Sequence, residues 1–203
     1  MFTPYEVYTE ETLKDIHLPS SELVGNEFHD CTFQKCQFVE TTFRHCQFVN
    51  CIFDECDFSM AKIPNCVFVS AQFKQSVLIG IDWTQAAWSG VDQSLLSVDE
   101  PPKFEACVLN HSTFIGLDLT ELQCKDCQAL DVDFREANLS KANFDGTDLT
   151  QAIFQKTNLS HTDFSRARNY HIQPQKNTIK NAKFAIPEAI ALLYGLDIVM
   201  VEA

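Results

Sequence analysis

Residues 28–53 read FHDCTFQKCQFVETTFRHCQFVNCIF, and in this stretch a phenylalanine returns at every fifth position. From Phe33 onward a small residue, Cys or Thr, precedes each phenylalanine by two positions. The spacing extends in both directions, so that 14 successive positions five residues apart, from Leu23 to Trp88, are large and apolar. The chain therefore contains a short internal repeat, which has to be recognised before any helix or strand is assigned.

A second series with the same period follows, shifted by one residue from the first. The shift falls between Trp88 and Phe104, where Gly90 and two prolines favour a loop or bulge over residues 89–103. The central positions of this second series are Phe104, Leu109, Phe114, Leu119, Cys124, Ala129, Phe134, Leu139, Phe144, Leu149, Phe154, Leu159 and Phe164, and later Ile179 and Phe184.

A period of five fits neither the 3.6-residue turn of an α-helix nor the alternation of a simple strand. It fits a chain that turns one corner in each repeat. Two side chains of every repeat then point inward, the large central one and the small one two residues before it. The remaining three point outward, which accounts for the polar residues that fill those slots.

Repeats such as Ala137-Asn138-Leu139-Ser140-Lys141 resemble the A-(D/N)-L-x-x unit of the pentapeptide-repeat family. The resemblance implies an all-β fold, a right-handed quadrilateral parallel β-helix with four repeats per coil, here about seven coils. We expect an N-terminal lead-in or cap over 1–22 and the β-helix over 23–186, interrupted at 89–103. A C-terminal helix and strand are expected over 187–203, where they would mediate dimerisation.

The interruption at 89–103 has two interpretations. It is either a repaired insertion on the rod surface or a contact loop, since solenoid insertions map to loops that sometimes bind partners. In the second case the loop would present apolar and acidic side chains to a partner, namely Leu95, Leu96, Val98, Asp99 and Glu100.

The C-terminal segment has the start and stop signals of a short helix, with Pro187 and Glu188 at its beginning and Gly195 at its end. Residues 196–201 read as a strand. One interpretation is that this helix serves simply as a cap on the last coil. The helix is apolar over most of its circumference, however, which favours a two-fold dimer interface. The residues of the predicted interface are Ile186, Ala189, Ile190, Leu192, Leu193, Leu196 and Ile198.

The formal net charge of −13 argues against binding of nucleic acid through phosphate contacts and favours a basic partner. Residues 1–20 lack the pattern of a signal peptide, and no later stretch resembles a membrane span, so we expect a cytoplasmic protein without membrane contact.

Nine cysteines could suggest zinc or disulfides, but eight occupy the small inward slot and Cys124 is itself a central residue. The repeat therefore predicts buried thiols, with no metal site and no bridge. No G-x-S-x-G, phosphate-binding glycine loop or H-E-x-x-H is present, so we expect no catalytic residues, no cofactor and no enzymatic activity.

Within the family, the chain looks most like the topoisomerase-protecting branch, which contains quinolone-resistance, microcin-immunity and albicidin-resistance proteins. The resemblance rests on the Cys-x-Phe-rich first half, the tryptophans before the frame shift, residues 169–172 and the tail over 181–189. It implies a dimeric DNA mimic that binds DNA gyrase, and possibly topoisomerase IV, and protects it from a drug or toxin. The unbroken first frame lacks the earlier projecting loop of the quinolone-resistance members, so albicidin-like or microcin-like protection fits better.

Outward acids would form the surface that meets the basic DNA-binding saddle of gyrase. From these we select Glu121, Asp126, Asp131 and Glu136 as contacts, together with the loop residues above. The alternative is a structural or scaffolding repeat protein without a topoisomerase target.

Overall fold

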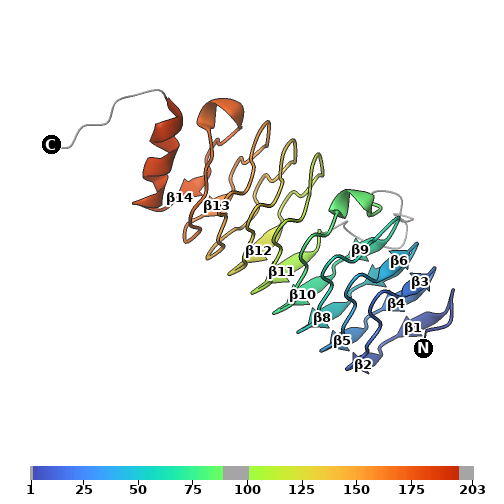
Figure 1. Ribbon diagram of the computed structural model, residues 1–203. Coiled ribbons are helices and arrows are strands. Elements are labelled where there is room, and N and C mark those ends of the chain that lie inside the picture. The colour runs from blue at the N-terminus through green and yellow to red at the C-terminus, as the bar shows by residue number, and fades with distance from the viewer. Residues whose placement is uncertain (1, 89–100, 197–203) are drawn as a thin grey trace.

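A computed structural model describes residues 2–88 and 101–196 of the chain. The described residues form one elongated stack of coils, with the N-terminus at one end and a helix at the other (Figure 1). The strands are β1 Val7–Thr9, β2 Thr12–Lys14, β3 Glu22–Val24, β4 Glu27–His29, β5 Thr32–Gln34, β6 Thr42–Arg44, β7 Gln47–Val49, β8 Ile52–Asp54, β9 Val67–Val69, β10 Gln72–Lys74, β11 Lys103–Glu105, β12 Gln123–Lys125, β13 Asp163–Phe164 and β14 Lys183–Phe184. Three 3₁₀ helices complete the set, η1 Trp83–Gln85, η2 Pro174–Lys176 and η3 Glu188–Leu196.

All strand pairs are parallel, and partners within an uninterrupted part of the stack are separated by four repeats, as in Phe33↔Phe53. Four sides, one for each repeat, therefore make one coil, which confirms the predicted four-sided parallel β-helix. The stack has about eight turns rather than the expected seven. The longest sheet has the order β12-β11-β10-β8-β5-β2 and runs along one side of the rod.

The frame shift is an insertion into one coil. Phe73 pairs with Phe104, which is 31 residues further along the chain. Regular neighbours such as Asp30 and Asn50 are 20 residues apart, which is four repeats. The excess is two repeats plus one residue, and this single extra residue shifts the frame. The coil itself continues in register on both sides of the interruption. The predicted loop residues Leu95, Leu96, Val98, Asp99 and Glu100 lie outside the described residues.

The core is built from the central and the small slots of the repeat. Phe53 is fully buried and stacks on Phe33 at 4.8 Å and on Phe73 at 4.7 Å between ring centroids. The small-slot side chain points toward the previous coil, so that the Cys51 thiol donates to the Phe28 carbonyl at 3.3 Å. Most repeats therefore have Cys, Ser, Thr or Ala in this slot, although Ile81, Leu122 and Val132 are also accommodated there and are buried.

The coils begin upstream of the predicted boundary at Leu23. Strand β1 pairs with β4 and places Tyr8 beside Phe28, so residues within the expected lead-in already form a coil. The small slots of this first coil hold Glu6 and Glu11, both exposed, because no earlier coil is stacked on them among the described residues. These two glutamates concealed the repeat in the sequence.

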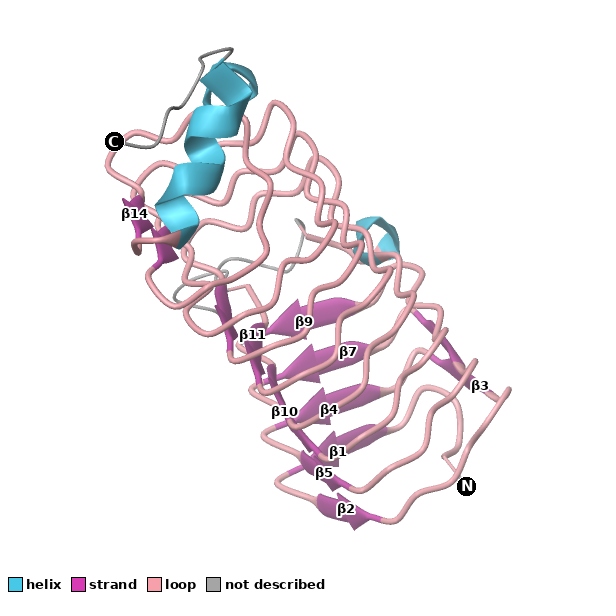
Figure 2. Ribbon diagram, turned by 60° about the vertical axis from the view of Figure 1, so that its left-hand side comes forward, coloured by secondary structure: helices cyan, strands magenta, loops and turns pink. Residues whose placement is uncertain are grey.

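The C-terminal helix is present, as predicted, and lies across the end of the stack beside β14 (Figure 2). It is a 3₁₀ helix rather than an α-helix. Of the predicted strand over 196–201, all residues after Leu196 lie outside the described residues, and Ile198 is among them.

Candidate partner-binding surfaces

The corners of the rod display the outward side chains. The residue two positions after most centres adopts a left-handed backbone conformation, with φ of 68° at Glu121, 52° at Asp126, 54° at Asp131 and 61° at Glu136. These four predicted contact acids therefore occupy the four successive corners of a single coil. They point in four directions around the rod and do not form one patch.

Three of the four acids also have cationic or titratable partners in neighbouring coils. The Glu121 carboxylate accepts from Lys141 at 2.8 Å and that of Glu136 from Lys156 at 3.2 Å. Asp131 lies 3.7 Å from the His111 ring nitrogen. Such exposed pairs contribute little stability, but the two lysine pairs reduce the charge that Glu121 and Glu136 offer to a basic partner.

Asp126 differs from the other three, since its corner neighbour in the next coil is Gly146. This glycine has a φ of 75°, and a Cβ atom added to it would collide with the Asp126 carboxylate. Because glycine has no Cβ atom, it permits both the left-handed backbone at this corner and the close approach of the Asp126 side chain.

Near the C-terminal end, three basic residues pair with acids of the preceding coil. Arg166 donates two hydrogen bonds to Asp145, at 2.9 and 2.6 Å, and holds the pKa of that carboxyl below its usual value. Arg168 lies 3.3 Å from Asp148, and Lys183 lies 3.1 Å from Asp163 in the preceding coil. The downstream half of the rod is therefore covered by ion pairs between coils.

The upstream coils have a different balance. Residues 1–60 contain 11 acidic residues and only three Lys or Arg. Two of these three bases are paired, Arg44 with Glu22 at 3.2 Å and Lys35 with Glu55 at 3.9 Å. Within the described part of the chain, no ion pair reaches the remaining outward acids of these coils, which include Glu10, Asp30, Glu40, Asp54 and Asp57.

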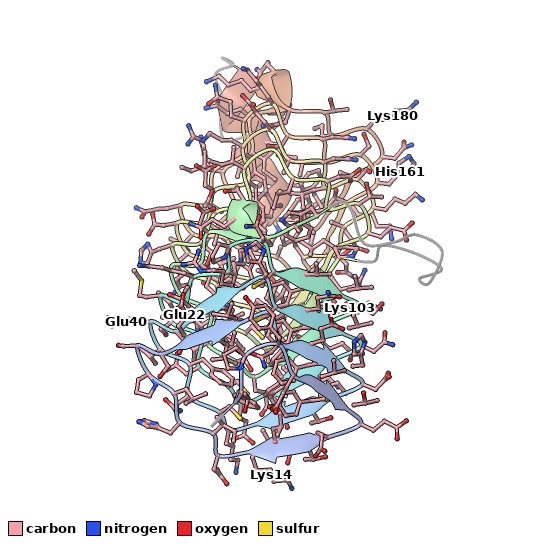
Figure 3. All side chains as sticks on the ribbon, turned by 90° about the vertical axis from the view of Figure 1, so that its right-hand side faces the viewer. Lys14, Glu22, Glu40, Lys103, His161 and Lys180 are labelled. Carbon is pink, nitrogen blue, oxygen red and sulfur yellow. The ribbon has the colours of Figure 1, made fainter. Side chains whose placement is uncertain are left out.

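The unpaired acids are distributed over the upstream rod and are held by the fold itself. Asp30 accepts from Asn50 at 3.2 Å, and Glu40 accepts from Ser20 at 3.0 Å, each across one coil. Figure 3 shows Glu22 and Glu40 projecting from the same side of the upstream coils. We call the acids that no described ion pair reaches, Glu10, Asp30, Glu40, Asp54 and Asp57, the upstream acidic surface.

The C-terminal helix presents two different sides. A 3₁₀ helix has three residues per turn, so residues three apart are aligned. Ala189 and Leu192 are half-buried, and Leu192 packs on the end of the core. The stripe of Ile190, Leu193 and Leu196 is exposed, at 44%, 38% and 38%. Ile186, just before the helix, is 86% exposed. The predicted interface residues are therefore divided between two sides of the helix. Ala189 and Leu192 face the last coil, and the exposed residues are Ile186, Ile190, Leu193 and Leu196.

The nine cysteines are all free thiols and all buried, which confirms their predicted inward placement. Burial raises the pKa of Cys51 to about 12, so this thiol remains a hydrogen-bond donor at neutral pH. Over residues 2–88 and 101–196, no three His, Cys, Asp or Glu side chains gather as they would around a metal ion. In the same part of the chain, no helix has the length and apolar character needed to span a bilayer.

Comparison with known proteins supports the repeat over most of its length. Two family models match, a pentapeptide repeat region at residues 26–101 and eight pentapeptide repeats at residues 131–168, together more than half of the chain. No curated protein matches the chain in sequence.

Several solved structures share the fold. A trypsin-treated variant of QnrB1, a plasmid-mediated fluoroquinolone resistance protein, aligns with a TM-score of 0.67 and 15% identity, over 98% of this chain and 99% of that chain. Full-length QnrB1 has a TM-score of 0.58 and 16% identity, over 92% and 100%. HetL, a pentapeptide repeat protein involved in heterocyst differentiation regulation in the cyanobacterium Nostoc, has a TM-score of 0.62 and 17% identity, over 88% and 85%. At these identities the likeness concerns the fold alone.

Proposed function

Because this chain belongs to the pentapeptide-repeat family, we propose that it acts as a non-catalytic DNA mimic that binds DNA gyrase, or topoisomerase IV. By occupying the DNA-binding surface it protects the enzyme from an antibiotic or toxin that acts on the DNA complex. This function requires no cofactor and takes place in the cytoplasm.

The observation that carries the proposal is the upstream acidic surface. A basic DNA-binding saddle attracts a narrow rod of opposite charge and steers its approach. Among the described residues no ion pair reaches Glu10, Asp30, Glu40 or Asp54, whereas Glu121 and Glu136 are paired with lysines of the next coil. The proposed contact therefore moves from the coil of Glu121 to the first three coils. The loop residues Leu95 to Glu100 remain proposed as a second contact.

We further propose that the functional unit is a homodimer joined through the C-terminal helices. The exposed stripe of Ile190, Leu193 and Leu196, together with Ile186, is an apolar surface at the end of an otherwise polar rod. A two-fold axis through this stripe would bury it against its own copy and leave both upstream acidic surfaces pointing outward. Such a dimer would present two acidic arms, as the two halves of a gyrase saddle require.

The alternative function is that of a structural or scaffolding protein without a topoisomerase target. HetL, which is involved in the regulation of differentiation, aligns with this chain about as well as QnrB1 does, so the fold does not favour one function over the other. On this alternative, the acidic coils would serve solubility and the apolar helix would mediate assembly.

The test is plasmid supercoiling by purified DNA gyrase, with this protein titrated against an inhibitory dose of albicidin, microcin or a fluoroquinolone. We expect restored supercoiling near equimolar protein. Neutralising Glu10, Asp30, Glu40 and Asp54 to Gln or Asn should abolish it. The matched control neutralises the paired residues with Glu121→Gln and Lys141→Gln and should retain protection. Equal protection by both variants would contradict the upstream contact, and no effect of the native protein would favour the scaffold.

A further inference from the structure

The N-terminal end of the rod is an open end of the stack. Strands β1 and β2 are terminal in their sheets, and each pairs on one side only, with β4 and β5 (Figure 1). The opposite end is covered, because the C-terminal helix lies across it and Leu192 packs on the core there. Among the described residues, the two ends of the rod therefore expose different groups.

The first coil presents unpaired backbone groups at the open end. In later coils the amide of the residue before a centre donates to the preceding coil, as Glu27 does to the Glu6 carbonyl at 3.0 Å. Val7 and Thr12 hold the same place in the first coil, and no coil precedes them among the described residues. Exposed strand edges of this kind are templates for pairing with another chain.

The open end also exposes part of the core. Phe2 packs edge-on against Tyr8 and Phe28, at 5.3 and 5.4 Å between ring centroids, and so belongs to the core. The large side chains of the second coil are buried, but those that fill the first coil are only half-buried, namely Phe2, Tyr8, Leu13, Ile16 and Leu18. Apolar side chains and free strand edges together favour association with a second copy.

Two carboxylates interrupt this surface. Glu6 and Glu11 occupy small slots, whose side chains point toward the preceding coil, as the Cys31 thiol does in its 3.5 Å contact with the Tyr8 carbonyl. Where no coil precedes, the same direction leads out of the end of the rod. Both acids are exposed, and the Tyr8 hydroxyl donates to Glu6 at 2.5 Å. In the next coil the corresponding residues, Asn26 and Cys31, are buried.

We propose that Glu6 and Glu11 close the N-terminal end against a second copy of this chain. Because the helix covers the other end, the surface that a second copy offers is its own N-terminal end. A two-fold pairing of these ends would bring two such carboxylates from each copy into one contact.

Burying a carboxylate is costly unless a cation pairs with it, and residues 1–20 contain a single Lys or Arg, Lys14, in an outward slot. The stack therefore ends at the first coil, although its strands and its core would accept another. This property is independent of the proposed topoisomerase function and of the C-terminal helix.

The experiment is sedimentation equilibrium of the full chain over a concentration series, with Glu6→Ser and Glu11→Ser combined. Serine is buried in the same slot at Ser76 and Ser112. We expect self-association about 100-fold tighter than that of the native chain, because the charges no longer enter the contact. The comparison with the native chain holds whether or not the C-terminal helices also join copies. Amide hydrogen exchange at Val7 and Thr12 should slow in the variant, which locates the contact at this end.

The matched control combines Glu10→Gln with Asp15→Asn, which removes two charges from outward corners of the same coil and should leave the mass unchanged. Glu6→Lys with Glu11→Lys keeps a charge in each slot and should also leave it unchanged. Glu6→Gln with Glu11→Gln preserves the size of both side chains, should tighten association, and carries the test if the serine variant does not fold.

The native mass in the serine and glutamine variants would overturn the proposal. Equal association by the corner control or by the lysine variant would overturn it as well, and so would unchanged exchange at Val7 and Thr12 in a variant that associates.

Discussion

Replacing Phe53 by alanine tests how the rod is held together. Phe53 is fully buried, stacks on rings of the coils before and after it, and touches Phe48 and Phe58 edge-on at 5.4 and 5.2 Å. Truncating such a side chain costs about 3–5 kcal/mol, from lost apolar burial and from the cavity left behind. Phe53→Leu should cost only about 1–2 kcal/mol, because leucine is accepted at the central slot of many downstream repeats.

Urea unfolding followed by tryptophan fluorescence measures these losses, because buried Trp83 lies near the middle of the stack and reports on the adjoining coils. The outward substitution Gln34→Ala serves as the control and should change the free energy of unfolding by less than about 0.5 kcal/mol. A loss below about 1 kcal/mol for Phe53→Ala would refute the account in which stacked central rings stabilise neighbouring coils.

Three further predictions concern the helix, the corners and the acid range. Replacing Ile190 and Leu193 by Asp should halve the mass measured by analytical ultracentrifugation, whereas a mass unchanged from the native value would contradict the dimer proposal. Ala106→Gly should raise the free energy of unfolding in urea by about 0.5–1 kcal/mol, because Ala106 has a φ of 53°, while Ala106→Val should lower it by about 1–2 kcal/mol. The pKa of Asp145 is lowered chiefly by hydrogen bonds from Arg166, so its contribution to stability is present above pH 4 and is lost as the pH falls through its lowered folded value. Arg166→Gln should therefore reduce the loss of stability between pH 4 and pH 2, and an unchanged acid-unfolding profile would contradict this assignment.

Much of the fold can be predicted from the sequence, because the five-residue period constrains every inward slot. Phe53 and Cys51 are placed correctly by counting alone, and the frame shift locates the insertion. The first coil was missed because Glu6 and Glu11 occupy slots that are small and buried elsewhere. Trp88, counted as a central residue, is only half-buried and donates its indole hydrogen bond to the Trp83 carbonyl at 2.7 Å.

The candidate surfaces were harder to predict, although part of the signal was present. Once four sides are assumed, a separation of four repeats pairs Glu121 with Lys141 and Glu136 with Lys156, so the neutralised corners could have been identified. The register of Lys74 with Glu105 could not, because the insertion separates these two residues by more than the regular four repeats. The 3₁₀ geometry that separates the stripes of the C-terminal helix also has no distinct sequence signal.

The central claim is that the acidic rod takes the place of duplex DNA on gyrase. The most direct measurement is fluorescence anisotropy of a labelled duplex bound to purified gyrase while this protein is titrated. The account predicts full displacement of the duplex by the native protein and little displacement by the variant neutralised at Glu10, Asp30, Glu40 and Asp54. A duplex that stays bound while the protein binds the same gyrase, seen as a ternary complex in sedimentation, would contradict DNA mimicry.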